Sequence, residues 1–107
     1  MIRFDSAWKQ GVKKVGVEFF NLKASSLNDA HKRWQLEPNY QFIKEAIGGY
    51  SHSKQVLLAM MYSFFDSECG QELLEKVGTS NFVDARSYLD EEGIYIISEL
   101  WNSHYGW

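Results

Sequence analysis

Cysteine is scarce in this 107-residue chain, and no apolar run is long enough to cross a membrane. Its single cysteine, Cys69, excludes an intramolecular disulfide framework of the kind that holds small secreted proteins together. The longest apolar run, residues 56–61, is far shorter than the roughly 20 residues that span a bilayer. Residues 1–5 do not resemble the start of a secretory signal peptide. We therefore expect a cytoplasmic protein, of the small bacterial kind, without a membrane segment.

Positive charge is scarce in the second half of the chain. From Gln55 onward only Lys76 and Arg86 are basic, and nine Asp and Glu residues oppose them, which gives this half a net charge of −7. Up to Lys54, nine Lys and Arg residues face five Asp and Glu residues, for a net charge of +4. Such halves either attract each other, within one bundle or between two chains, or leave a basic surface free for nucleic acid.

The composition is that of a folded globular domain. Hydrophobic residues make up 45% of the chain and charged residues 23%, and we expect a single helical domain over residues 1–107 with a core that needs no metal. Aromatic residues are unusually frequent, at 16%. Rings fill a small core efficiently, and they are also common anchors of protein interfaces. The core is therefore expected to take most of the rings and to leave a few for an interface.

Apolar residues recur with helical spacing along most of the chain. This pattern predicts an all-α fold, a compact single-domain bundle of about six or seven short helices around a central apolar helix at 54–65. The residues expected to face inward are Phe4, Trp8, Val12, Val15, Phe19 and Leu22, then Leu27, Ala30, His31 and Trp34, then Phe42, Ile43, Ala46 and Ile47, and finally Phe82, Ala85, Leu89, Ile94, Ile97, Leu100 and Trp101.

Helix boundaries follow from capping residues. A Ser26–Asp29 capping box opens a helix that Pro38 ends, and Pro38 suits the first turn of the next helix. Gly78 closes a helix at 68–77, and Asn81 and residues 90–92 begin the last two. Residues 15–20 fit the end of a helix at 4–22 or a short strand, and the helix is preferred because its periodicity is longer.

A loop before the central helix offers the strongest local signal for a ligand site. Gly49, Ser51, His52, Ser53 and Lys54 combine a flexible backbone with hydroxyl, imidazole and ammonium groups at a helix N-terminus, where an anion is favoured. The spacing of a phosphate-binding P-loop is absent. Ordinary capping explains most of these residues without a ligand.

Other signals for chemistry are weak. The three histidines show no metal-binding spacing, so no metal or cofactor is expected. Cys69 begins a helix, but the adjacent Glu68 and Glu72 disfavour a reactive thiolate. No motif of an enzyme is present. We therefore lean against catalysis.

The expected function is that of a small accessory protein that binds a protein partner or a second copy of itself. The candidate interface residues are Trp34, Tyr40, Tyr50 and Trp107. Trp107 either locks the last helix into the core or offers its ring to another chain. The alternatives are a nucleic-acid-associated protein that uses the basic N-terminal half, and an anion binder or enzyme that uses the 48–54 loop.

Overall fold

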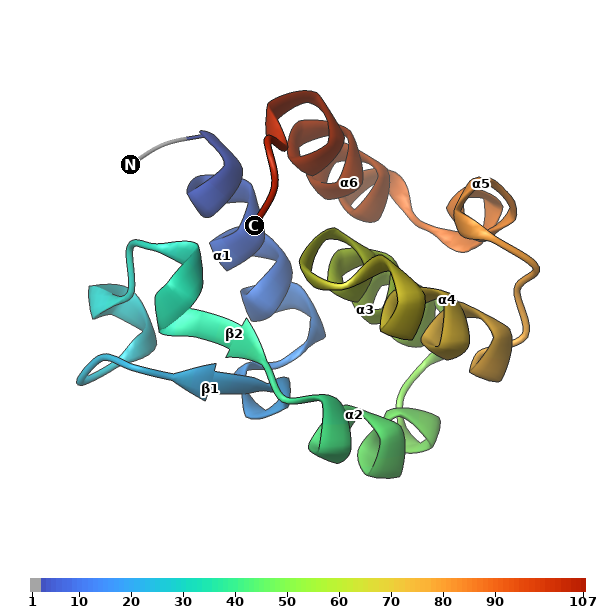
Figure 1. The fold of residues 1–107 in the computed structure, drawn as a ribbon, viewed down its shortest axis with the longest axis horizontal. Coiled ribbons are helices and arrows are strands. Elements are labelled where there is room, and N and C mark those ends of the chain that lie inside the picture. Colours follow the sequence, from blue (N-terminus) through green and yellow to red (C-terminus); the bar gives the residue numbers. More distant parts are fainter. Residues whose placement is uncertain (1–2) are drawn as a thin grey trace.

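The computed structural model describes residues 3–107 as a mostly helical globule with one small β-hairpin (Figure 1). Its elements are α1 (Arg3–Val15), β1 (Phe20–Leu22), β2 (Leu36–Pro38), α2 (Tyr40–Ala46), α3 (His52–Phe65), α4 (Ser67–Lys76), α5 (Phe82–Ala85) and α6 (Glu91–Ser103). Short 3-10 turns lie at 17–19, 27–29, 33–35, 47–49 and 86–88. The expected all-α class and the number of helices are confirmed, while the hairpin is an addition that the periodicity did not predict.

Helix α3 is the central helix, as its composition predicts. Residues 56–62 are all buried, so every side of the helix contacts protein. It packs against α1, α4 and α6. The α3–α4 contact is close, because a Cβ atom at Gly70 would lie 2.5 Å from the Cα atom of Ser63. Figure 1 shows α6 above this pair, α2 below it, and α1 with the hairpin beside it on the left.

The first helix is shorter than predicted. It ends at Val15, because Gly16 takes a φ of 123°, in the left-handed region that glycine adopts most readily. The preferred helix over 16–22 is therefore wrong, and the extended segment lies at Phe20–Leu22. Leu22 is partly exposed, contrary to expectation. The hairpin is tied to α1 by the indole of Trp8, whose Nε1 donates to the carbonyl of Leu36 at 2.8 Å.

The helix predicted after Ser26 is also absent. The carboxylate of Asp29 accepts bonds from the Ser25 and Ser26 hydroxyls, and the Gln35 side chain accepts from two backbone N–H groups, which stabilises 3-10 turns instead. The side chains that an α-helix over this segment would place on one face therefore do not share a face in the 3-10 turns. Ala30 is buried as expected, whereas His31 and Trp34 are exposed.

Pro38 is the last residue of β2 rather than the first turn of a helix. Asn39 follows it and caps α2, accepting a bond from the N–H of Phe42 at 3.2 Å. Phe42 itself is 37% exposed, where the periodicity predicted burial. Within residues 3–107, no helix has the length and apolar character needed to cross a membrane.

The later helix boundaries agree with the sequence. Asn81 and Asp90 cap α5 and α6 through their side-chain oxygens, and Gly78 takes a φ of 91° after α4. One inward prediction fails in α6. Ile97 and Leu100 are buried, but Trp101 is 65% exposed, because it lies beyond the stripe that faces α3.

Candidate functional site

A hollow of about 270 Å³ lies between α5 and α6, and large apolar side chains line it. We call it the α5–α6 surface; it consists of Phe82, Val83, Arg86, Ile97, Ser98, Trp101 and Asn102. Val83 is 82% exposed and Trp101 is 65% exposed. Large contiguous apolar patches on a folded protein mark interaction sites, and this surface brings two exposed apolar side chains together beside a hollow.

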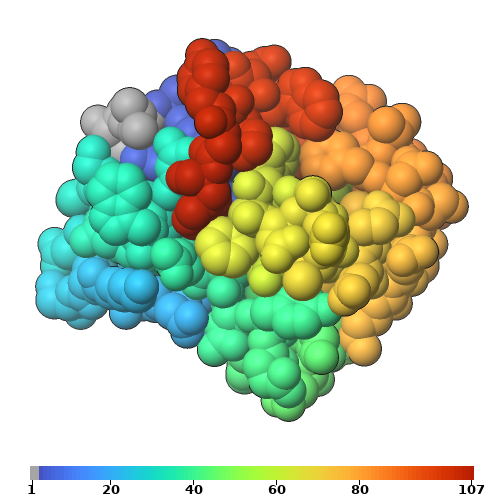
Figure 2. Space-filling view, in the orientation of Figure 1, coloured from blue at the N-terminus to red at the C-terminus, as the bar shows by residue number. Residues whose placement is uncertain are grey.

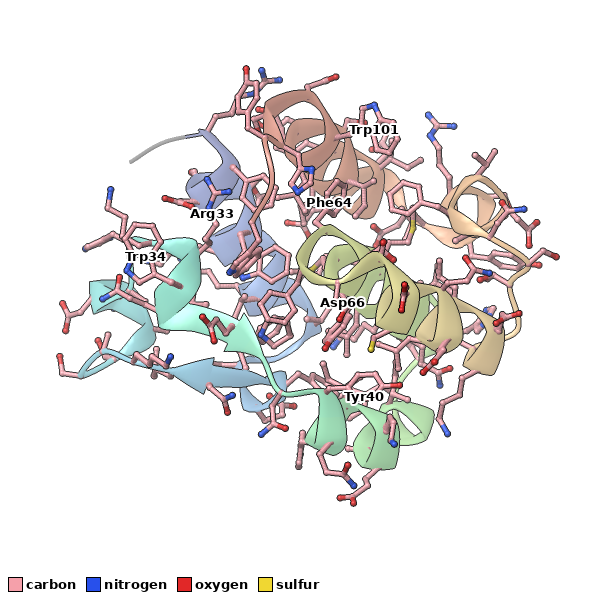
Figure 3. The ribbon with its side chains drawn as sticks, viewed as in Figure 1. Arg33, Trp34, Tyr40, Phe64, Asp66 and Trp101 are labelled. Carbon is pink, nitrogen blue, oxygen red and sulfur yellow. The ribbon has the colours of Figure 1, made fainter. Side chains whose placement is uncertain are left out.

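A second cavity, of about 460 Å³, adjoins this surface and shares Phe82 and Trp101 with it. Its apolar wall is formed by Phe64, Phe82, Trp101 and Leu74. Figure 3 shows Phe64 between α6 and the α3–α4 pair, and Trp101 beside α6 on the side toward α5. The two hollows adjoin at these two shared rings, and their lining residues come from four helices, α3, α4, α5 and α6; we call the two hollows together the recess.

The ring of Trp101 is held from one side only. Its centroid lies 5.6 Å from that of Phe82, at an interplanar angle of 36°, and 6.4 Å from that of Phe64, near edge-to-face. Phe64 and Phe82 are in edge-to-face contact at 5.6 Å. These contacts orient the indole although most of it faces solvent, so the recess is formed before any partner arrives.

Four polar side chains line the cavity: Ser63, Ser67, Gln71 and His104. Their donors are largely used within the protein. Gln71 Nε2 donates to the carbonyl of Ser80 at 2.9 Å, Ser63 Oγ donates to that of Ala59 at 3.0 Å, and His104 Nε2 lies 3.2 Å from that of Phe64.

The acceptors of two of these side chains remain open. Within residues 3–107, neither Gln71 Oε1 nor the second ring nitrogen of His104 has a hydrogen-bond partner, and neither is enclosed by protein. With Nε2 as the donor to a carbonyl, the neutral His104 ring presents Nδ1 as an acceptor. The cavity therefore offers these two acceptors to a ligand, together with the hydroxyl group of Ser67.

Charge is nearly absent from the recess. Arg86, at the rim of the α5–α6 surface, is the one Asp, Glu, Lys or Arg residue that lines either hollow. Across residues 3–107 it has no carboxylate oxygen within ion-pair distance. The guanidinium is thus available to an outside carboxylate.

The interface residues expected from sequence do not come together. Trp34 is 54% exposed with the Lys32 ammonium 6.0 Å from its ring, and it lies far from Trp101 in Figure 3. The hydroxyl of Tyr40 donates to Glu72 at 2.8 Å, and this bond raises the pKa of Tyr40 to about 12.

Tyr50 and Trp107 both pack against the core. The hydroxyl of Tyr50 donates to Glu18, and its ring meets Phe19 at 4.7 Å. Trp107 is half-buried, with its centroid 4.7 Å from that of Trp8 and 4.9 Å from that of Phe65. In Figure 2 the C-terminal segment, in red, lies across the middle of this face. Whether any of the four binds a partner stays a prediction.

The 48–54 loop is used for local structure. His52 Nε2 donates to the carbonyl of Val77 at 2.8 Å, which satisfies a group at the C-terminal end of α4, and its ring meets Tyr88 at 5.0 Å. Ser51 is the N-cap residue of α3, without a side-chain capping bond, and Gly49 ends the preceding 3-10 turn. Neither hollow described above is lined by this loop. Anion binding by Ser53, Lys54 and their neighbours stays a prediction.

Cys69 lies beside α3 in an environment that keeps the thiol protonated. Burial raises its pKa first, and the neighbouring Asp66 raises it further. Figure 3 shows Asp66 between α3 and α4. In the described part of the chain, no group of three or more His, Cys, Asp and Glu side chains is arranged to hold a metal ion.

The unequal charge of the two halves is partly neutralised where α1 packs on α6. Lys14 lies 2.9 Å from Asp90 and 3.0 Å from Glu92, and Arg3 Nε donates to Glu99 at 3.1 Å. Basic groups of the first half thus pair with acidic groups of the second within one chain. This pairing leaves fewer cations free for the phosphates of a nucleic acid.

Comparisons of the chain with protein-family models, with curated proteins and with solved structures find no match. The α5–α6 surface was missed at the sequence level because Trp101 was assigned to the core. A signal was present: Ile96, Ile97 and Leu100 already fill the inward positions of α6, which leaves Trp101 at the edge of the stripe.

Proposed function

We propose that this protein is a small accessory protein that binds a protein partner through the α5–α6 surface, without catalysis of its own. The observation that carries the proposal is the exposed, pre-oriented indole of Trp101, which lies beside Val83 and lines both adjoining hollows. Tryptophan and arginine are the residues most enriched among interface hot spots, and Arg86 adds the second of them.

The polar rim supports the same function. Ser98 and Asn102 flank the apolar centre, and neither carries a charge that would have to be desolvated. An apolar centre with a polar border is the usual anatomy of a protein interface. Ser63, Ser67 and His104 line the cavity, but within residues 3–107 no hydrogen bond joins either serine to the histidine, as the activation of a serine nucleophile would require.

The test compares two exposed tryptophans. Tagged wild-type protein, Trp101→Ser and Trp34→Ser are used to capture proteins from the source cells, and light scattering measures self-association of each. A partner, or a dimer, that is retained by Trp34→Ser and lost by Trp101→Ser supports the proposal. Equal capture by all three proteins, or loss with Trp34→Ser alone, would place the interface elsewhere.

A further inference from the structure

The chemistry of the recess also indicates what the partner presents. We infer that the partner inserts a tryptophan or tyrosine ring into the cavity beside Trp101 and places a carboxylate on Arg86. The inference rests on the proposed function, because it assumes that the α5–α6 surface is the binding surface. It adds the identity of the two contacting groups.

The size and the walls of the cavity favour a ring. Its volume of about 460 Å³ falls in the range of roughly 300–1,000 Å³ that is typical of sites for small ligands, and one aromatic side chain fits within such a space. Phe64, Phe82 and Trp101 present ring edges and faces to it. An added ring gains edge-to-face or offset contacts here that an aliphatic side chain cannot make.

The open acceptors favour a ring that donates a hydrogen bond. Gln71 Oε1 and the free nitrogen of His104 accept but do not donate, and an indole N–H or a phenol O–H matches them. A phenylalanine ring would cover these acceptors without replacing their water. A lysine or arginine anchor would also donate, but it would enter a cavity that no carboxylate lines, with Arg86 lining the adjoining hollow.

Charge complementarity supplies the second contact. Arg86 has no carboxylate partner in the described part of the chain, and it lies on the hollow that shares Phe82 and Trp101 with the cavity. A partner segment that fills the cavity therefore passes close to the guanidinium. An acidic side chain near the anchoring ring would pair with it, while a basic one would be repelled.

A peptide selection tests both contacts without knowledge of the natural partner. A random 12-residue phage library is selected on wild-type protein, with Trp101→Ser protein as the counter-selection. We expect the enriched peptides to combine a Trp or Tyr with a nearby Asp or Glu. Arg86→Glu should change the preferred charge from acidic to basic, whereas Lys76→Glu, on the exposed side of α4, should leave it unchanged.

Substitutions in one selected peptide measure each contact. Replacing its Trp with 1-methyltryptophan, which removes only the N–H donor, should weaken binding about two- to tenfold, the range of one hydrogen bond. Replacing its acidic residue with Gln should weaken binding about two- to fivefold, and this loss should vanish on the Arg86→Gln protein.

The outcomes separate the two proposals. Peptides that require Trp101 but carry aliphatic anchors, or basic residues, overturn this inference and leave the binding surface in place. Absence of any enrichment over Trp101→Ser overturns both.

Discussion

Two tryptophans of the C-terminal segment have opposite surroundings. Trp107 contacts the rings of Phe4, Trp8 and Phe65 and lies beside the backbone that Arg33 holds at Gly106. Trp101 contacts rings on one side and solvent on the other. In the first region, which we call the closed end, the rings of Phe4, Trp8, Phe65 and Trp107 contact one another and Arg33 pairs with Asp5. On the α5–α6 surface, the ring of Trp101 and the guanidinium of Arg86 lack full partners within residues 3–107. A second molecule would supply these partners.

The largest effect is expected from the ion pair beneath the closed end. Asp5 is 2% exposed, and its Oδ1 accepts from the Nε of Arg33 at 2.7 Å. Arg33→Met leaves the carboxylate buried without its cation, so we expect a loss of about 3–5 kcal/mol in the free energy of unfolding, measured by urea denaturation. Replacement of the neighbouring exposed Lys32 by Met should cost less than about 0.5 kcal/mol.

A double variant separates the charge from the packing. Asp5→Leu combined with Arg33→Met removes both charges, and it should recover most of the stability lost in the single variant. A single variant that loses less than about 1 kcal/mol would show that the pair does not hold the closed end together.

Substitution of Trp107 and Trp101 is expected to have the next largest effect on the free energy of unfolding. Trp107→Ala should cost about 2–3 kcal/mol, below the usual penalty for a fully buried ring because Trp107 is only half-buried. Trp101→Ala, with 65% of the residue exposed, should cost less than about 1 kcal/mol while it abolishes partner binding. Equal costs for the two substitutions, again in urea, would remove the distinction between the two regions.

Gly70 tests how rigidly the floor of the recess is built. A Cβ atom there meets the backbone of Ser63, which lines the cavity, so α3 and α4 must separate. We expect Gly70→Ala to cost about 1–2 kcal/mol in thermal unfolding. Gly48→Ala adds a Cβ that meets nothing within 4 Å and should change stability by less than about 0.5 kcal/mol. Similar melting temperatures for the two variants would mean that the contact between α3 and α4 adapts to an added methyl group.

The sequence predicts best where one helix face is apolar and its ends carry capping residues. The run 56–61 identifies the central helix, and Asn81, Asp90 and Gly78 mark real boundaries. The prediction fails between residues 16 and 38, where the outcome depends on contacts distant in sequence. The indole of Trp8 binds the carbonyl of Leu36, and Asn39 binds Phe19 across the hairpin.

The same dependence explains the binding surface. Periodicity places Leu100 in the inward stripe of α6 and Trp101 at its edge, but it does not tell whether a residue at the edge is covered by another element. Its exposure is decided by α5, a helix of four residues whose packing places Phe82 against one side of the indole and Val83 in solvent. Such a short element carries almost no periodic signal.

The smallest effect on stability is expected at two surface cations: Lys14, which pairs with Asp90 and Glu92 where α1 packs on α6, and Arg86 of the α5–α6 surface. Backbone bonding from Gly93 and then the bond to Lys14 lower the pKa of Asp90, and Lys14 lowers that of Glu92. A carboxyl group whose pKa is lowered on folding stabilises the native state above its unfolded pKa, near 4, and this contribution is lost as the pH falls through the folded pKa. Lys14→Gln should therefore reduce the melting temperature at pH 7 and leave it nearly unchanged near pH 3.

Arg86→Gln is the matched control, because Arg86 has no ion pair within residues 3–107. Its melting temperature should follow that of the wild type at both pH values. Salt should shrink the Lys14 effect, since the pair lies at the surface. A loss at pH 7 for Arg86→Gln as large as that for Lys14→Gln would mean that Arg86 already has a carboxylate partner within the molecule, and the α5–α6 surface would then lack the free cation that distinguishes it from the closed end.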